Sequence, residues 1–478
     1  MNNIILSDMS SFFSSSLHLQ NRFQSFSSFQ TWFESRCRPN EFSVEKIPLE
    51  EMEKWRFDDS KSRLYHESGR FFYIEGIHVK TNFGKIPEWE QPIIHQPEIG
   101  ILGIITKVFD GVRYFLMQAK MEPGNINILQ ISPTVQATKS NFSRVHQGKL
   151  PAYLEYFIGQ KTVRTLVDQL QTEQGGRFFQ KRNRNMIIEI LDDIEVYDDF
   201  CWLTLAELKL LLQKDNVLNM DTRSVLSTVP LIDENVLADF EKIDVTSFSS
   251  INRYEISEIG REFIKSCTSN NTLHGIDDII SWYNRQKVVY ELDVIPKPLS
   301  QIQGWKIGKD SIFSEKGFFS VIGVKVSAGT REVTRWMQPL IEDTNIGLLA
   351  FVTKKIDGIL HFLIQAKVEP GNKDIIELSP TVSCSNYTYV ARREEKPFMF
   401  NEVFNPENTI HFDSLQSEEG GRFYQLQNRN IIVELVHSQE YLLPTNFIWM
   451  SLKQMKEFMR YGMFNIEARS IISTISFI

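Results

Sequence analysis

Two short segments of the chain place a lysine and a glutamate next to a tight turn. Gln118-Ala-Lys-Met-Glu-Pro-Gly-Asn125 returns far along the chain as Gln365-Ala-Lys-Val-Glu-Pro-Gly-Asn372. Proline fixes φ and glycine permits a tight bend, so Glu-Pro-Gly-Asn predicts a turn that ends a strand. Such a turn would place Lys120 and Glu122 at the mouth of a pocket, where a carboxylate and an ammonium can serve proton transfer. The alternative is a turn with a structural role alone.

A second motif holds two adjacent glycines between charged residues. Gln171-Thr-Glu-Gln-Gly-Gly-Arg-Phe178 returns as Gln416-Ser-Glu-Glu-Gly-Gly-Arg-Phe423. Paired glycines let a backbone approach a ligand closely. A turn alone does not require so much polarity before an apolar strand, so we predict that Glu173 and Arg177 lie beside a ligand.

The segment Lys181-Arg-Asn-Arg-Asn185 brings several donors to the start of an apolar run. Alternation along a strand puts Arg182 and Arg184 on one face and Lys181, Asn183 and Asn185 on the other. Such donors are costly to desolvate without anionic partners, and a diphosphate is a natural partner for arginine. The alternative is the solvated end of an edge strand.

The polar stretch Ser140-Asn-Phe-Ser-Arg-Val-His146 carries one aromatic residue and one histidine. Its counterpart keeps Ser385-Asn-Tyr387 but no histidine. A lone histidine is more often structural than chemical, and the other histidines form no pair with metal-ligand spacing. The four cysteines are widely scattered, which favours reduced thiols over a disulfide framework or a metal site. We therefore expect no bound metal.

Bulk properties and missing motifs exclude several classes of protein. The 478 residues carry a net charge of −8 and form no basic stripe, so nucleic acid is not an expected partner. GxGxxG, Walker, HExxH and GxSxG patterns are absent, which argues against nicotinamide binding, P-loop chemistry and zinc proteolysis. The start does not read as a signal peptide, and no apolar run reaches the ~20 residues of a membrane span. We expect a cytoplasmic protein without a membrane partner.

The motifs recur in the same order, which identifies the chain as a tandem duplication. Ser132-Pro-Thr-Val135 returns as Ser379-Pro-Thr-Val382, and Arg223-Ser224 returns as Arg469-Ser470. Units this long indicate two similar domains rather than a solenoid. We predict a first repeat over residues 1–228, a packed connector over 229–265 and a second repeat over 266–478.

Each repeat is predicted to follow one pattern of elements. Amphipathic helices are expected at 23–37 and 276–288. A β-hairpin follows over 101–120 with an Asp-Gly turn at 110–111, which suits a type I′ turn. We expect a strand that ends near Ser132, a long strand over 176–191 and a final helix. That helix opens with the capping box Thr204-Leu-Ala-Glu207, matched by Ser451-Leu-Lys-Gln454. The predicted class is α+β with antiparallel-rich sheets.

The ordered set of motifs resembles a known family. The set comprises Glu-Pro-Gly-Asn, Ser-Pro-Thr-Val-Gln-Ala-Thr, Ser-Asn-Phe-Ser-Arg-Val-His, Glu-Gln-Gly-Gly-Arg-Phe, Lys-Arg-Asn-Arg-Asn and Asn-Met-Asp-Thr-Arg-Ser (219–224). It is similar to the NDP-hexose 2,3-dehydratases of deoxysugar biosynthesis over nearly the full chain. The resemblance implies a homodimer, a Nudix-like fold in both halves, and a nucleotide-sugar pocket in each half, one catalytic and one a remnant. The Glu-rich Nudix signature is missing, so pyrophosphate hydrolysis is not expected.

The resemblance also implies a reaction. The substrate would be an NDP-4-keto-6-deoxyhexose, most often linked to dTDP. Its C4 ketone acidifies the proton on C3, a base removes that proton, and the C2 hydroxyl leaves with the help of an acid. The enol then tautomerises to a 3,4-diketo-2,6-dideoxy sugar. No cofactor is needed because the ketone is the electron sink, and the labile product calls for a partner 3-ketoreductase.

Roles are assigned within this resemblance. The first repeat is the expected catalytic one, because it keeps Lys181, Arg182 and His146. The catalytic candidates are Glu122, His146 and Glu173, with the order of acid and base left open. The substrate-binding candidates are Lys120, Asn141, Phe142, Arg144, Arg177, Lys181, Arg182, Asn183 and Arg184. The candidates for a second, accessory site are Glu369, Tyr387, Glu418, Arg422, Asn428 and Arg429.

Two other classes of function stay open from the sequence. One is a nucleotide-sugar-binding protein that has lost chemistry, and the other is a Nudix-type hydrolase, disfavoured by the missing glutamates. The nucleotide base and the stereochemistry of the sugar are not fixed by the sequence.

Overall fold

The structure is a computed structural model of the chain. It describes residues 2–37, 42–138, 151–232, 235–236, 256–329, 334–393, 395–436 and 440–478. Among these residues, no helix has the length and apolar character that crossing a membrane requires.

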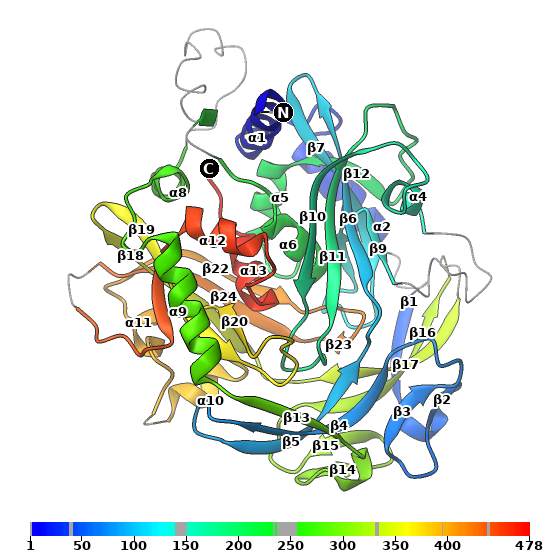
Figure 1. Cartoon of the computed structure of the whole chain (residues 1–478). Coiled ribbons are helices and arrows are strands. Elements are labelled where there is room, and N and C mark those ends of the chain that lie inside the picture. Colours follow the sequence, from blue (N-terminus) through cyan, green and yellow to red (C-terminus); the bar gives the residue numbers. More distant parts are fainter. Residues whose placement is uncertain are drawn as a thin grey trace.

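Two seven-stranded sheets with the same strand order form the bulk of the molecule (Figure 1). The first contains β6 (Gly100–Phe109), β7 (Val112–Met121), β8 (Leu129–Ser132), β9 (Val135–Ala137), β10 (Arg164–Thr172), β11 (Arg182–Glu189) and β12 (Phe200–Thr204). The second contains β18 (Gly347–Ile356), β19 (Ile359–Val368), β20 (Ile376–Ser379), β21 (Val382–Cys384), β22 (Thr409–Ser417), β24 (Gln427–Glu434) and β25 (Phe447–Ser451). Each sheet has one parallel pair, β6–β11 or β18–β24, among antiparallel neighbours. The class is therefore α+β, and the repeated strand order follows the duplication.

Local signals in the sequence locate most of these elements. The hairpin turn has φ of 49° at Asp110 and 81° at Gly111, and the second hairpin turn likewise has positive φ at Asp357 and Gly358. Positive φ at both central positions is what a type I′ turn requires, so that prediction is confirmed. The long strand expected over 176–191 is wrong in its first part, because β11 begins only at Arg182. Residues 173–181 instead form a closed turn, in which the Glu173 N–H donates to the Lys181 carbonyl.

Two smaller sheets are built from strands of both repeats. The first holds β2 (Trp55–Phe57), β3 (Arg63–His66), β4 (Tyr73–Thr81), β5 (Glu88–His95) and, from the second repeat, β13 (Leu292–Lys297). The other holds β14 (Trp305–Ile307), β15 (Ser311–Ser314), β16 (Ser320–Ala328), β17 (Arg335–Glu342), β23 (Phe423–Tyr424) and, from the first repeat, β1 (Phe42–Ile47). β1 pairs antiparallel with β16, and β13 pairs antiparallel with β4. Each repeat therefore gives its first strand to a sheet of the other repeat. The boundaries at residues 228 and 266 stay a prediction of where the sequence repeats end and begin.

Helices cover the two large sheets. They are α1 (Asn2–Ser16), α2 (Phe26–Arg36), α4 (Leu154–Phe157), α5 (Leu205–Leu212), α6 (Met220–Ser227), α8 (Glu258–Thr268), α9 (Ile276–Val289), α10 (Tyr387–Ala391), α11 (Phe400–Val403), α12 (Leu452–Met459) and α13 (Ile466–Ile472). Single turns of 3-10 helix lie at Leu49–Glu51 and Leu299–Gln301. α2 and α9 match the two predicted amphipathic helices, and both predicted capping boxes are formed, at α5 and α12.

The two repeats meet through a pair of buried arginines on α6 and α13, the helices at the centre of Figure 1. Arg223 donates to the Leu218 carbonyl at 2.6 Å and to the Ser470 hydroxyl at 2.9 Å. Arg469 donates to the Phe464 carbonyl at 2.8 Å and to the Ser224 hydroxyl at 3.3 Å. Each guanidinium thus satisfies carbonyls of its own repeat and reaches across to the other, which explains why both copies keep Arg-Ser.

A second symmetric contact differs in one residue. In the first repeat Gln130 hydrogen-bonds the Ser417 hydroxyl at 2.8 Å, whereas the equivalent Glu377 accepts from the Thr172 hydroxyl at 3.0 Å. Burial raises the pKa of Glu377 to about 8. A carboxyl therefore occupies a place where the other copy uses a neutral amide.

Glu377→Gln is expected to stabilise the protein at pH 8.5 and to change little at pH 5. The stability that the protonated Glu377 provides is complete below its unfolded pKa of 4.5 and is lost as the pH rises through about 8. At ~1.4 kcal/mol per unit of pKa shift, the shift from 4.5 to about 8 corresponds to a gain of at most about 5 kcal/mol at pH 8.5. Thermal or urea unfolding at the two pH values measures it. Gln130→Glu is the reciprocal variant and should lose stability as the pH rises, while equal effects at both pH values would contradict this reasoning.

Candidate active site

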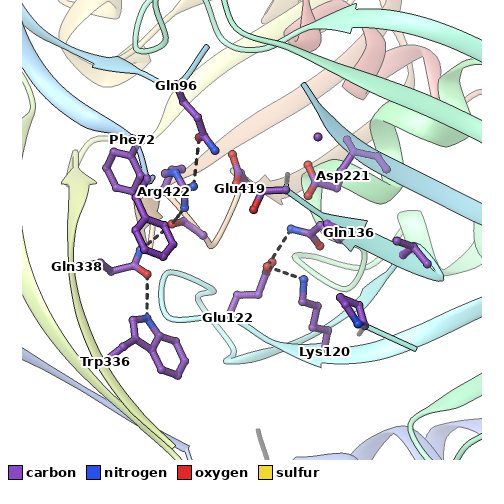
Figure 2. A pocket seen from close by; sticks show the side chains of 18 of the residues that line it. Phe72, Gln96, Lys120, Glu122, Gln136, Asp221, Trp336, Gln338, Glu419 and Arg422 are labelled. Atoms are coloured by element: carbon purple, nitrogen blue, oxygen red, sulfur yellow. Dashed lines mark hydrogen bonds and ion pairs between the residues drawn. The ribbon is translucent and has the colours of Figure 1, made fainter. Parts of the chain in front are cut away.

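A cavity of about 640 Å³ lies between the repeats. The first repeat lines it with the ends of β6, β7, β9 and β11 and with the start of α6, and the second repeat lines it with β17 and the turn at 419–422. Its size suits a small-molecule ligand. Figure 2 shows the polar side chains that point into it.

A lysine and a glutamate at the end of β7 form the floor of the polar part. Lys120 Nζ lies 3.1 Å from a carboxylate oxygen of Glu122, and the Gln136 amide donates to the same oxygen at 3.0 Å (Figure 2). Glu122 is 5% exposed. The structure therefore brings Lys120 and Glu122 to a pocket, as their place before the turn predicted. Two donors hold the Glu122 carboxylate in a fixed position.

The Glu-Pro-Gly-Asn turn contacts the other repeat rather than a ligand. The Gly124 N–H donates to the Gly420 carbonyl at 2.7 Å, and the Gln425 N–H donates to the Gly124 carbonyl at 2.7 Å. A Cβ on Gly124 would lie 1.5 Å from the Phe423 carbonyl oxygen, so no larger residue fits. Gly420 faces the Asn125 side chain as closely. The close approach that the structure shows at the paired glycines is thus an approach to protein, and a ligand beside Glu173 and Arg177 stays a prediction.

The same contact occurs in the opposite direction. The Gly371 N–H donates to the Gly175 carbonyl at 2.7 Å, and the Gln180 N–H donates to the Gly371 carbonyl at 2.9 Å. A Cβ on Gly371 would lie 1.7 Å from the Phe178 carbonyl oxygen. We call these paired contacts the reciprocal turns: 122–125 on 419–425, and 369–372 on 174–180.

The reciprocal turns exchange two arginines between the sites. Arg422 lies in the first cavity, 4.2 Å above the Phe72 ring, and donates to Gln96 at 3.2 Å (Figure 2). Arg177 lies over Phe319 with its guanidinium 3.9 Å from Asp343 of the second repeat. The sequence assigned Arg177 to the first site and Arg422 to the second. The structure places them the other way round, because each turn crosses to the opposite repeat.

The Lys-Arg-Asn-Arg-Asn segment divides as strand alternation predicts. Lys181 and Asn183 line the cavity, and Lys181 Nζ donates to the Glu98 carbonyl. Burial lowers the pKa of Lys181. Arg184 lies on the opposite face in a bidentate ion pair with Asp168, and neither Arg182 nor Arg184 lines the cavity. The segment thus gives the cavity one cation rather than three.

Glu173 supports the cavity wall from behind. Its carboxylate accepts from the Asn183 amide at 2.6 Å, and burial raises its pKa to about 7. Glu173 itself is not among the residues that line the cavity. Glu418 and Asn428 repeat this pair in the second repeat, and burial raises the pKa of Glu418 to about 7 as well.

The remaining predicted residues fall in three groups. Asn141, Phe142, Arg144 and His146 lie outside the described residues, as does the side chain of Tyr387. Arg429 forms an outer-face ion pair with Asp413, equivalent to that of Arg184. Glu369 accepts from Lys367 at 2.8 Å in the second repeat. None of these three groups adds a described side chain to the first cavity.

Two cavity carboxyls were missed by the sequence analysis. Asp221, at the start of α6, and Glu419, from the turn of the second repeat, both face the cavity (Figure 2). Burial, and next the Glu419 carboxylate, raises the pKa of Asp221 well above its usual range. Burial also raises the pKa of Glu419, against the opposing effect of Arg422. A comparison of the two repeats could have pointed to both residues, because the repeats differ at both positions. Glu467 is the counterpart of Asp221, and Gln174 is the counterpart of Glu419.

The equivalent position in the second repeat is closed by internal pairs. Lys367 contacts Glu369, Ser383 and Glu467, and Arg177 faces Asp343. The first cavity has Gln96 where the second repeat has Asp343, and Lys181 where it has Leu426. Two cations of the first cavity thus keep capacity for an external anion, whereas the arginine and lysine of the second site face carboxylates.

A cavity that brings cations together with titratable carboxyls is typical of enzymes that transfer protons on an anionic small molecule. The comparisons with known proteins make this class specific. The chain belongs to the NDP-hexose 2,3-dehydratase family, whose description matches residues 26–229 and again residues 276–475. The family pattern therefore fits each repeat separately.

Curated relatives cover nearly the whole chain. A dTDP-4-dehydro-6-deoxy-alpha-D-glucopyranose 2,3-dehydratase from Saccharopolyspora spinosa is 42% identical over 456 residues, which is 94% of this chain and 90% of the relative. Proteins with the same name from Amycolatopsis orientalis and Streptomyces violaceoruber are 39% and 37% identical, each over 94% of this chain and over 89% and 96% of their own lengths. Among solved structures, a C. elegans Ap4A hydrolase aligns with 28% of this chain and 95% of its own, at 14% identity and a TM-score of 0.18, which is too low to carry an argument.

Gly371→Ala is expected to destabilise the protein strongly, because the new methyl group would overlap the Phe178 carbonyl and separate the reciprocal turns. Overpacking of this kind typically costs ~1–3 kcal/mol. Thermal unfolding followed by circular dichroism measures the loss. Gly176→Ala is the matched control: its Cβ would meet only a Glu369 oxygen at 3.7 Å, so it should unfold like the wild type. Equal melting temperatures for both variants would contradict the tight contact.

Proposed function

We propose that this protein removes water across C2 and C3 of dTDP-4-keto-6-deoxyglucose, and that the cavity of the first repeat is its active site. Supporting this are the family of the chain and the substrate named for the relative that is 42% identical to it. The observation that carries the choice of cavity is the cation pair Lys181 and Arg422, because the second site has Leu426 in place of Lys181 and its arginine, Arg177, lies 3.9 Å from Asp343.

The chemistry requires a group that stabilises an enolate. The C4 ketone withdraws electrons when the C3 proton leaves, and negative charge develops on the C4 oxygen. Lys120 is the ammonium that lines the polar part of the cavity, and we assign it as the donor to that oxygen. Glu122 and Gln136 then orient Lys120. Elimination of the C2 hydroxyl gives an enol that tautomerises to the 3,4-diketo-2,6-dideoxy sugar.

The diphosphate needs cations in the cavity. Lys181 and Arg422 both line it, from the first and the second repeat respectively. Arginine suits phosphate because its planar fork donates two hydrogen bonds at once. Arg422 is already aligned over Phe72 and hydrogen-bonded to Gln96, so it loses little freedom on binding.

Several finer features remain proposals that follow from the resemblance. They are a Nudix-like fold of each repeat, a homodimer in the cytoplasm, a catalytic first site with a vestigial second site, and a 3-ketoreductase that takes up the labile product. His146 stays a candidate for catalysis and Phe142 a candidate for substrate binding.

The proposed function is tested by incubating the protein with dTDP-4-keto-6-deoxyglucose, a 3-ketoreductase and NADPH. The expected result is a 2-deoxy nucleotide sugar, detected by mass spectrometry, formed together with oxidation of NADPH. Tight binding of the nucleotide sugar without a 2-deoxy product would favour a binding protein instead. Release of a sugar phosphate would favour a hydrolase.

Lys181→Met is expected to raise KM for the nucleotide sugar by about tenfold or more and to leave kcat less affected, because it removes a charge-assisted contact to the diphosphate. Steady-state kinetics measure both constants. Arg184→Met is the matched control, since Arg184 lies on the outer face of the same strand in an exposed pair with Asp168. A KM that rises in Arg184→Met and not in Lys181→Met would reverse the assignment of the two faces.

A further inference from the structure

Asp221 is a buried carboxyl that the protein leaves without a partner. It is 2% exposed at the second position of α6, and no hydrogen bond or ion pair links its carboxyl to another of the described residues. A carboxyl with so little exposure and no partner among the described residues costs stability, and the polar surface that it keeps faces the cavity. The start of a helix favours a negative charge, but it does not explain why this one points into a cavity unpaired.

In the second repeat, the carboxyl at the equivalent position, that of Glu467, has partners within the protein. Glu467 is one methylene longer and reaches Lys367 at 3.2 Å, Ser383 at 3.3 Å and Asn465 at 2.9 Å. Lys367 also contacts Glu369, whereas in the first repeat Lys120 forms an ion pair with Glu122 and none with Asp221. The shorter Asp221 therefore keeps its carboxyl available, and the local fold is otherwise the same.

Glu419 brings a second carboxyl to the same part of the cavity from the other repeat. It precedes the paired glycines, and the reciprocal turns fix its backbone against Gly124. Figure 2 shows Glu419 between Arg422 and Asp221, above Gln136 and Glu122 in the view. Gln174 occupies the equivalent place opposite the second site. The carboxyl is thus confined to the cavity that we propose to be active.

Two neighbouring carboxyls in a cavity of low exposure do not both ionise near neutral pH. Burial raises the pKa of both Asp221 and Glu419, and the Glu419 carboxylate is the largest charge effect that raises the pKa of Asp221, so we expect the two groups to hold one proton between them. A pair in which one member is protonated and the other is ionised contains both an acid and a base.

We propose that Asp221 and Glu419 are the acid–base pair of the dehydration, so that the second repeat contributes a catalytic group to the cavity of the first. This inference rests on the proposed function. The ionised member takes the C3 proton, and the C3–H electron pair forms the enolate with the C4 ketone. The enolate then re-forms the ketone, the C2–C3 double bond forms, and the C2–O bond breaks. The protonated member gives its proton to the departing hydroxyl, which leaves as water.

The pair ends this elimination with one proton, now on the other member. Tautomerisation reverses that exchange. The newly protonated carboxyl delivers its proton to C2, and the other carboxylate accepts the proton of the C3 enol. The net change is loss of one water from the sugar, with no oxidant or reductant, and the pair returns to its starting state.

Asp221→Asn and Glu419→Gln test the proposal. Both changes keep the shape of the side chain, and glutamine already occupies the position equivalent to Glu419 in the other repeat. Each variant is expected to lower kcat by ~10²–10⁴ while dTDP binding, measured by calorimetry, is retained. In D₂O, the variant that keeps the base should still incorporate deuterium at C3 of the substrate without eliminating water. The variant that lacks the base should not.

Gln174→Ala and Glu467→Gln are the matched controls at the second site, and their turnover should equal that of the wild type. If either Asp221→Asn or Glu419→Gln keeps kcat within threefold of the wild type, the pair is not the acid and base. Exchange at C3 that is retained in both variants, or lost in both, overturns the division of roles. An inactive wild type would instead overturn the proposed function, so the two failures are distinguishable.

Discussion

The reciprocal turns are the contact on which the remaining geometry depends. Each Glu-Pro-Gly-Asn turn exchanges backbone hydrogen bonds with the Gly-Gly turn of the other repeat, through Gly124 and Gly420 on one side and Gly371 and Gly175 on the other. A Cβ on Gly124 or Gly371 would lie 1.5 Å or 1.7 Å, respectively, from a carbonyl oxygen of the opposite turn, so only glycine fits at these two positions. Because of this contact, Glu419 and Arg422 enter the first cavity and Arg177 enters the second site. The cavity is a product of both repeats even though its strands belong mainly to one.

The asymmetry of the two sites follows from a few substitutions on a shared frame. Asp343, Glu467 and Leu426 stand in the second repeat where Gln96, Asp221 and Lys181 stand in the first. Asp343 and Glu467 place carboxylates beside the cations of the second site, and Leu426 replaces a cation with an apolar side chain. The frame that both repeats share is held by residues with partners inside the protein, such as Arg223 and Arg469. The side-chain oxygens of Asn185 and Asn430 likewise accept hydrogen bonds, from Ser224 and Ser470 respectively. At these positions, the polar residues that both copies share support packing, whereas the three differences distinguish the two sites.

Sequence patterns located the parts of this structure that depend on local interactions. The hairpin turns, the capping boxes and the alternation that separates Lys181 from Arg184 each involve neighbours in the chain, so their residue types are informative. The exchange of β1 and β13 and the crossing of the two arginines depend on partners hundreds of residues away, and no local pattern encodes those. Strand periodicity also shows which residues share a face, but not which face meets the cavity. Asp221 was visible in a quoted motif, yet its lack of a partner is a property of the folded chain alone.

The exchange of first strands also sets an order of events during synthesis. β1 is among the earliest elements to leave the ribosome, whereas the residues of β16 that pair with it lie at 323–328. At roughly 5–20 residues per second, the wait is on the order of tens of seconds. During that time β1 has an open edge and the sheet of β2 to β5 lacks its partner β13. An unpaired edge of this kind is an aggregation hazard, so we expect the nascent first repeat to depend on chaperones until the second repeat has been made.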